Sequence, residues 1–206
     1  VLPYDDYTDF DIKNRHIYIE SSRGCPFTCE FCLSSIDSSM RYLPIDVFLN
    51  EIDKLWNRGA RNYKFIDRTF NLKISYAKAI LEYFLTKDED YFLHFEVIPD
   101  NFPPELRELL KKFKAGSLQL EVGIQTLNLD VAKNINRNLK IDKIKENLAF
   151  LSSETNAHMH IDLIVGLPSE TIDSFAQNLN LLYTLSNGEI QIGILKKLSG
   201  TTLNRH

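Results

Sequence analysis

The segment SSRGCPFTCEFC, residues 21–32, contains Cys25, Cys29 and Cys32, and no other cysteine occurs among the 206 residues. The spacing is C-x3-C-x2-C, directly after a predicted strand and a glycine. Pro26 disfavours a helix here, so the segment is predicted to be a loop. Because the three thiols lie so close together in the chain, their sulfurs can converge on one small group.

The number of cysteines limits what this loop can bind. Disulfide bonding is a poor explanation, because three thiols leave one unpaired. A structural zinc site needs a fourth ligand, which one of the five histidines could supply, although none is paired with the loop in the sequence. Three buried structural cysteines are a further reading. Three thiolates without a fourth suit a 4Fe-4S cluster that keeps one iron open for chemistry, since ordinary clusters of this kind take four.

Short β-branched or aromatic runs alternate along the chain with segments of helical period. This alternation is typical of repeated βα units around a parallel sheet. Six strands are predicted, approximately at His16–Ser22, Asn62–Asp67, Phe92–Val97, Ser117–Ile124, His158–Val165 and Glu189–Leu195. One helix is predicted between Pro44 and Gly59. A later helix is marked by an apolar stripe of Ile172, Phe175, Leu179 and Leu182.

Polar residues inside the predicted strands decide between an open sheet and a barrel. Strands of an α/β protein are normally apolar on both faces. Three of these strands instead have polar residues on one face, namely His94 and Glu96, then Glu121, Gly123 and Gln125, then His158, His160 and Asp162. Helices on both faces leave no room for so many buried polar groups, whereas the inside of a barrel can hold a polar ligand. We therefore expect an α/β fold with a partial (β/α)6 TIM-like barrel.

Composition argues against several other classes of protein. With 44% hydrophobic and 25% charged residues the chain can build one sizeable core, and a net charge of −4 argues against a nucleic-acid partner. No apolar run approaches the roughly 20 residues that span a bilayer, and no signal peptide is evident, so a cytoplasmic protein without membrane contact is expected. The first residue is Val1 rather than Met, which suggests a piece of a longer polypeptide.

The cysteine loop resembles the signature C-x3-C-x-aromatic-C of the radical S-adenosylmethionine (SAM) enzymes, with Phe31 as the aromatic residue beside the cofactors. The resemblance covers nearly the whole chain and implies the partial barrel of that family. It also implies that Cys25, Cys29 and Cys32 are the metal ligands of a 4Fe-4S cluster. In the family the open iron binds the amino and carboxylate groups of SAM, and an electron from the cluster splits SAM into methionine and a 5′-deoxyadenosyl radical.

Further segments resemble the family in order and imply SAM-binding residues. In FIDRTFN, Asp67 is expected to face the SAM ammonium, and Asn71 either joins the site or caps the next helix. In LEVGIQT, the side chains of Glu121 and Gln125 are expected to reach the ribose hydroxyls. In NINRNL, Arg137 is expected to approach the SAM carboxylate, a group that suits a guanidinium.

The segment DLIVGLPSET resembles the fifth strand of the family, beside adenine. Ile164 is expected to give apolar contact there, and Gly166 to permit close approach of the backbone. Each proposed role also has a structural alternative, such as a turn residue, a hydrogen-bond network that fills the barrel, or a solvated charge at a helix end.

The segments ESSRGCPFTCEFC, FIDRTFN and LSGT resemble most the cobalamin-binding-domain subgroup of this family, although FIDRTFN replaces the glycine-rich second-strand motif of many radical enzymes. The resemblance implies that residues 1–206 are a radical SAM core domain, preceded by a cobalamin-binding domain and followed by a variable domain. The expected function is reductive cleavage of SAM, or cobalamin-dependent methyl transfer, on an unidentified small-molecule or peptide substrate with an external electron donor.

Two other functions remain open at this point. The first is a non-catalytic iron-sulfur or zinc module with a redox-sensing or structural role. Such a module needs the cysteines but has no use for the polar side chains inside the barrel. The second is a tRNA-modifying methylthiotransferase, which ranks last because the chain lacks a basic appended domain for RNA.

Overall fold

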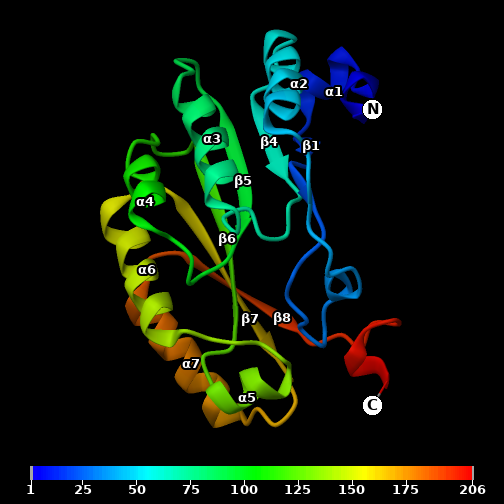
Figure 1. Ribbon diagram of the computed structural model, residues 1–206. Helices are drawn as coiled ribbons and strands as arrows, with labels where there is room; N and C mark the ends of the chain where they lie inside the picture. Colours follow the sequence, from blue (N-terminus) through cyan, green and yellow to red (C-terminus); the bar gives the residue numbers. More distant parts are fainter. Residues whose placement is uncertain (1, 206) are drawn as a thin grey trace.

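The structure, a computed structural model, describes residues 2–205, so Val1 and His206 at the ends of the predicted domain lie outside the described residues. Six strands form one sheet in which each strand pairs in parallel with the next along the chain (Figure 1). In order they are β1 (Ile17–Ile19), β4 (Asn62–Phe65), β5 (Phe92–Val97), β6 (Leu118–Gln125), β7 (His158–Val165) and β8 (Glu189–Ile194). All six predicted strands and their parallel arrangement are confirmed.

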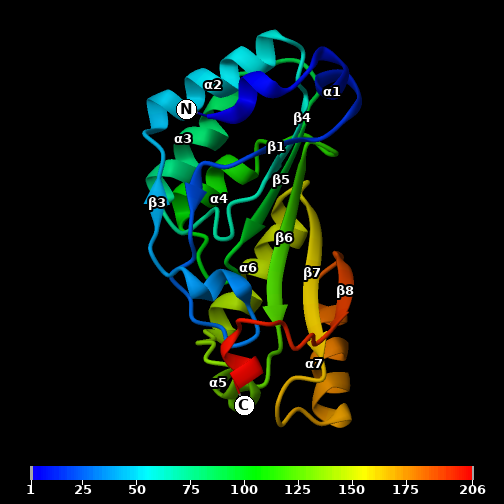
Figure 2. The ribbon, with the colours of Figure 1, turned by 90° about the vertical axis from the view of Figure 1, so that its right-hand side faces the viewer.

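The sheet is a partial barrel, as predicted. Among residues 2–205 no strand pairing joins β1 to β8, so the barrel is open between these two edges (Figure 2). Helices α3, α4, α6 and α7 lie along one side of the sheet, and the cysteine segment lies on the other side (Figure 1). The α-helices are α1 (Asp9–Asn14), α2 (Ile45–Asn57), α3 (Ile74–Leu85), α4 (Pro104–Leu110), α5 (Leu129–Asn134), α6 (Ile141–Glu154) and α7 (Ile172–Leu185).

Short elements frame the cysteine segment. A two-stranded antiparallel ladder of β2 (Ser22–Arg23) and β3 (Arg41–Tyr42) encloses it, and the 3-10 helix η2 (Leu33–Ile36) follows the last cysteine. Two further 3-10 helices, η1 (Pro3–Asp6) and η3 (Thr202–Arg205), lie near the two ends of the described chain. The cysteines are therefore in a loop after β1, as predicted.

Burial alternates along the strands and separates an apolar side from a polar side. In β6, Leu118, Leu120, Val122 and Ile124 are buried, while the residues between them are half-buried. In β7, Met159, Ile161 and Leu163 are buried in the same manner. The apolar side packs against the helices because that contact removes it from water. The other side presents the polar residues that the sequence placed on a shared face.

The predicted helix boundaries agree in part with the structure. Helix α2 begins directly after Pro44, and its buried residues include Phe48, Ile52 and Leu55. The predicted stripe of α7 is wrong at Ile172, the first residue of that helix, which is 81% exposed. Contact with the core begins one turn later, at the partly buried Phe175. Within residues 2–205, the helices are too short or too polar for any of them to traverse a bilayer.

Candidate active site

The three cysteines line a cavity of about 480 Å³ at the carboxyl ends of the strands. Cys25 and Cys29 are buried and Cys32 is half-buried. The volume lies within the range of small-molecule sites. The predicted residues that also line this cavity are Phe31, Glu121, Gln125 and Arg137. Residues from the loop and from two strand ends, far apart in the sequence, thus meet around one space.

Backbone contacts with neighbouring segments hold the cysteine loop in its conformation. Gly24 has a φ of +98°, and a Cβ at this position would lie 2.0 Å from the carbonyl oxygen of Ser39. The N–H of Cys25 donates to the carbonyl of Asp37 at 3.3 Å, and the N–H of Glu30 donates to the carbonyl of Ile135 at 3.1 Å. Only glycine fits at position 24, since both the φ and the close approach exclude a side chain.

The separation of the sulfurs tests which group the cysteines fit. Among residues 2–205, the three cysteines do not form a group whose ligand atoms all lie within 4.8 Å of one another. Two sulfurs on a single tetrahedral zinc are separated by less than about 4.6 Å, twice a Zn–S bond of ~2.3 Å. At least one pair of sulfurs is therefore too far apart to share a single zinc ion without movement of a side chain, and a larger group that takes several thiolates suits the loop. A 4Fe-4S cluster is such a group, and its ordinary ligands are cysteine thiolates.

Arg137 brings positive charge to the cysteines. Its Nη1 lies 3.6 Å from the sulfur of Cys29, and its Nη2 donates to the carbonyl oxygen of Gly123. Its Nε is buried and has no hydrogen-bond partner among the described residues. A guanidinium has five N–H donors and the two contacts use two of them, so Arg137, which lines the cavity, retains donors for an anionic ligand. This position is compatible with the carboxylate-binding role expected for Arg137.

Strands β5, β6 and β7 supply three carboxyl groups to the same cavity. Burial raises the pKa of Asp162 to about 7, with the charges of Glu121 and Glu96 adding to the effect. Burial also raises the pKa of Glu96, which pairs with Arg68 at 3.0 Å. The hydrogen bond from His94 at 2.9 Å lowers the pKa of Glu121 below its usual value. One wall of the cavity is therefore acidic, and Asp162 is the group on it that exchanges a proton near neutral pH.

Gln125 lies at the irregular end of β6. Its φ is +70°, and the register between β6 and β7 shifts between Gly123 and Gln125. A non-glycine residue with positive φ is uncommon and is concentrated at functional sites. A Cβ on Gly123 would meet the side-chain nitrogen of Gln125 at 2.9 Å, so the absence of a side chain there leaves room for the glutamine.

Asp67 does not line the cavity. Its side chain is buried and accepts hydrogen bonds from the N–H of Ser21 at 2.9 Å, the hydroxyl of Ser21 at 2.6 Å and the hydroxyl of Ser22 at 2.7 Å. Both carboxylate oxygens are therefore engaged by the residues that lead into the cysteine loop. These two serines were not singled out from the sequence. Their only signal is that they directly precede the cysteine motif.

Asn71 has a structural role other than the predicted helix cap. The residue before α3 is Lys73, and it makes no side-chain cap. The amide of Asn71 instead donates to the carbonyls of Ile98 and Asn101 and accepts from the N–H of Ile98 at 2.7 Å. It ties the turn after β4 to the loop after β5, which forms part of the cavity wall.

The predicted residues Ile164 and Gly166 lie outside the cavity lining, and Ile164 shares an apolar cluster with Phe31. Phe31 and Ile164 both pack against a small apolar cluster formed by Val131, Ile135 and Leu167. Neither Ile164 nor Gly166 lines the cavity, although Gly166, with a φ of +91°, allows the turn after β7. This apolar cluster supports the cysteine loop, because Phe31 belongs to that loop.

Comparison with known proteins identifies relatives over most of the chain. The model of the radical SAM superfamily matches residues 19–182. The ribosomal protein uS12 methylthiotransferase RimO of a Nitratiruptor species is 22% identical over 200 residues, covering 92% of this chain and 45% of the relative. The cobalamin-dependent radical SAM methyltransferase TokK of Streptomyces tokunonensis is 26% identical over 190 residues, covering 85% of this chain and 27% of the relative.

Solved structures share the fold. The radical SAM methyltransferase TsrM from Kitasatospora setae, with cobalamin and a [4Fe-4S] cluster bound, has a TM-score of 0.81 at 16% identity, covering 95% of this chain and 39% of TsrM. Coproporphyrinogen III oxidase (HemN) from Escherichia coli has a TM-score of 0.68 at 20% identity, covering 92% of this chain and 46% of HemN. The chain spans less than half the length of each of these four relatives.

Proposed function

The chain belongs to the radical SAM superfamily, and we propose that it is the catalytic core of an enzyme that cleaves SAM reductively. The observation that supports this most is the meeting of three cysteines, Arg137 and an acidic wall around one cavity of about 480 Å³. A purely structural metal module has no use for the polar residues of that cavity. The non-catalytic alternative is therefore not favoured.

We propose that Cys25, Cys29 and Cys32 hold the 4Fe-4S cluster. When bound, the cluster supplies the electron that splits SAM into methionine and a 5′-deoxyadenosyl radical. The protein's task is to hold the thiolates in place, and Gly24 does so by allowing the close approach of the loop backbone to Ser39. The cofactor does the difficult chemistry, and the chain orients it and excludes water.

The roles proposed for the SAM-binding residues follow from their positions. Arg137, whose Nη1 lies beside Cys29 and whose Nε has no partner among the described residues, is proposed to bind the SAM carboxylate close to the cluster. Glu121 in the middle of β6 and Gln125 at its carboxyl end both line the cavity and are proposed to bind the ribose. Phe31, Ile164 and Gly166 are proposed to support the adenine side. Asp67 is proposed to act as a positioning residue through Ser21 and Ser22.

The longer protein is proposed to combine residues 1–206 with a preceding cobalamin-binding domain and a following variable domain. The match to TokK over 85% of the chain supports cobalamin-dependent methyl transfer. We propose that the methyl acceptor is a small molecule or peptide. A methylthiotransferase reaction is the second candidate, supported by the match to RimO over 92% of the chain. Binding of cobalamin to the full-length protein separates the two.

The working environment is also a proposal. Members of this superfamily need an electron donor, and we propose an external one. Three free cysteines reserved for an iron-sulfur cluster require a compartment that keeps thiols reduced. We therefore propose that the protein works in the cytoplasm.

Anaerobic reconstitution with iron and sulfide tests the proposed function. Wild-type protein should take up close to four irons per chain, as one 4Fe-4S cluster requires. With SAM and dithionite, the loaded protein should then form 5′-deoxyadenosine, detected by chromatography. Cys32→Ala should lose both the cluster and the product. Stoichiometric zinc without iron uptake, or a loaded full-length protein that forms no 5′-deoxyadenosine, contradicts the proposal.

A further inference from the structure

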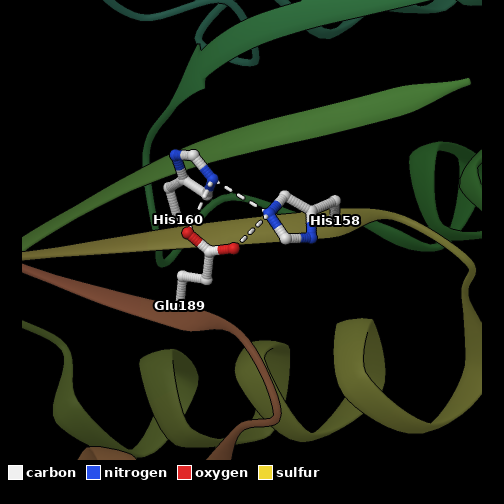
Figure 3. A group of neighbouring side chains, drawn as sticks. All are labelled: His158, His160 and Glu189. Carbon is white, nitrogen blue, oxygen red and sulfur yellow. Dashed lines mark hydrogen bonds and ion pairs between the residues drawn. The ribbon is translucent and has the colours of Figure 1, made fainter. Parts of the chain in front are cut away.

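A second group of metal-ligating side chains lies toward the amino ends of β7 and β8. His158 and His160 project from the first half of β7, and Glu189 is the first residue of the neighbouring strand β8 (Figure 3). None of the three lines the cysteine cavity. At about 3.3 Å per residue, His160 is roughly 16 Å along the strand from Val165 at the carboxyl end of β7.

The three ligand atoms are spaced as they would be around a single ion. The Nε2 atoms of His158 and His160 are 2.9 Å apart. One carboxylate oxygen of Glu189 lies 3.4 Å from Nε2 of His158, and the other lies 3.5 Å from Nε2 of His160. Ligands at about 2.0–2.1 Å from a tetrahedral zinc are separated from one another by roughly 3.3 Å. One ligand atom from each of the three residues lies within 4.8 Å of the other two, so small side-chain movements suffice to place them on one triangular face of a tetrahedron.

A further pair of side chains orients His160. The side-chain nitrogens of Gln119 on β6 and Gln191 on β8 both contact its Nδ1, the former at 3.2 Å. A half-turn of either amide presents its oxygen, which can accept a hydrogen bond from Nδ1–H. The lone pair of Nε2 is then directed at the metal position. A ligating histidine almost always has such a partner on its other nitrogen.

We propose that His158, His160 and Glu189 bind one zinc ion, with water in the fourth position. Two histidines and one glutamate form a known zinc ligand set, and zinc binds such ligands more strongly than ferrous iron does. The side chains of His158 and Glu189 are 47% and 67% exposed, so water and the ion have access. Since the ligands come from two strands, the ion joins the largely exposed edge strand β8 to β7.

Zinc binding to cluster-loaded protein is the direct test, because the cluster occupies the cysteines. Zinc sulfate is added, and X-ray absorption at the zinc edge distinguishes nitrogen and oxygen ligands near about 2.0–2.1 Å from sulfur near about 2.3 Å. One zinc per chain with nitrogen and oxygen ligands and no sulfur is expected. Zinc–sulfur scattering places the metal on the cysteines and overturns the proposal, as does the absence of stoichiometric zinc.

Substitutions locate the ion independently of catalysis. His160→Ala and Glu189→Gln should each lower zinc affinity more than Gln191→Ala, for which a loss of about 10- to 100-fold is expected. His16→Ala, which removes an exposed histidine before β1, should bind zinc as wild type does. Zinc should raise the melting temperature of wild type but not of His160→Ala. Wild-type affinity in both His160→Ala and Glu189→Gln overturns the proposal, whereas failure of SAM cleavage alone leaves it unaffected.

Discussion

Replacement of Asp67 by asparagine distinguishes two roles for this residue. The carboxylate accepts three hydrogen bonds from Ser21 and Ser22, and only 1% of the residue is exposed. An asparagine has nearly the same shape, but its nitrogen is a donor and cannot accept. In Asp67→Asn, the nitrogen of the asparagine side chain therefore faces at least one of these donors, either the buried N–H of Ser21 or a serine hydroxyl. An unsatisfied buried donor costs about 1–3 kcal/mol.

Thermal unfolding measures this cost. In a domain of about 200 residues, 1 kcal/mol shifts the melting temperature by roughly 2–4 °C, so Asp67→Asn should melt about 2–12 °C below wild type. Because the serines lead into the cysteine loop, the variant should also retain less cluster. Asp88→Asn, which changes an exposed aspartate, should melt as wild type does.

The affinity for SAM decides between the two roles. If Asp67 only positions the cysteine loop, Asp67→Asn protein that is loaded with cluster should bind SAM nearly as wild type does. Direct contact with the SAM ammonium instead predicts a loss of one charge-assisted hydrogen bond, about 1.5–3 kcal/mol or roughly 10- to 160-fold in affinity. An unchanged melting temperature together with such a loss would refute the positioning role.

Three further predictions follow from the site. Arg137→Ala should weaken SAM binding to cluster-loaded protein about 10- to 160-fold in calorimetry. Arg137→Lys should lose less affinity for SAM because the positive charge remains. Equal SAM affinity in wild type and Arg137→Ala contradicts the role proposed for Arg137. Gly24→Ala should prevent retention of the cluster, which iron analysis measures. Gly59→Ala is the control: its φ of +101° is similar, but a Cβ there would meet no atom within 4 Å, so this variant should lose stability and keep its iron. The hydrogen bond from His94 lowers the pKa of Glu121 below the ordinary value of 4.5. This hydrogen bond therefore stabilises the folded protein at pH values above 4.5, and the stabilisation is lost as the pH falls through the lowered pKa. Urea unfolding should therefore show Glu121→Gln less stable than wild type by about 1 kcal/mol at pH 7, with the difference shrinking below about pH 4.5.

The fold was largely predictable because its signal is local. Hydrophobic period and strand spacing are read within windows of about ten residues, and they located all six strands. The polar face of β6 was predictable for the same reason, since alternate residues of a strand share a face. Cys25, Cys29 and Cys32 were found by spacing, and the structure places them around one cavity.

The partners of buried polar residues were not predictable, because they come from distant parts of the chain. Asp67 was assigned to a ligand by its chemistry, but its hydrogen-bond donors lie 45 and 46 residues away, on Ser22 and Ser21. Asn71 was predicted either to join the site or to cap the next helix, yet its side chain bonds to a loop 27 to 30 residues later. A sequence shows which groups a side chain can bind, but only the fold shows which of them are already satisfied.

The register of the parallel strands determines how the cysteine cavity and the proposed zinc site interact. Glu121 on β6 lies directly beside His160 on β7, which lies beside Glu189 on β8. Glu121 thus borders both sites, and the charge of His160 contributes to lowering its pKa. The free-energy effects of substitutions at adjacent residues are coupled, whereas those of substitutions more than about 7–10 Å apart are usually additive. Substitutions at Glu121 and His160 should therefore be non-additive in a double-mutant cycle, while Arg137 and His158, which share no contacts in the described chain, should behave independently.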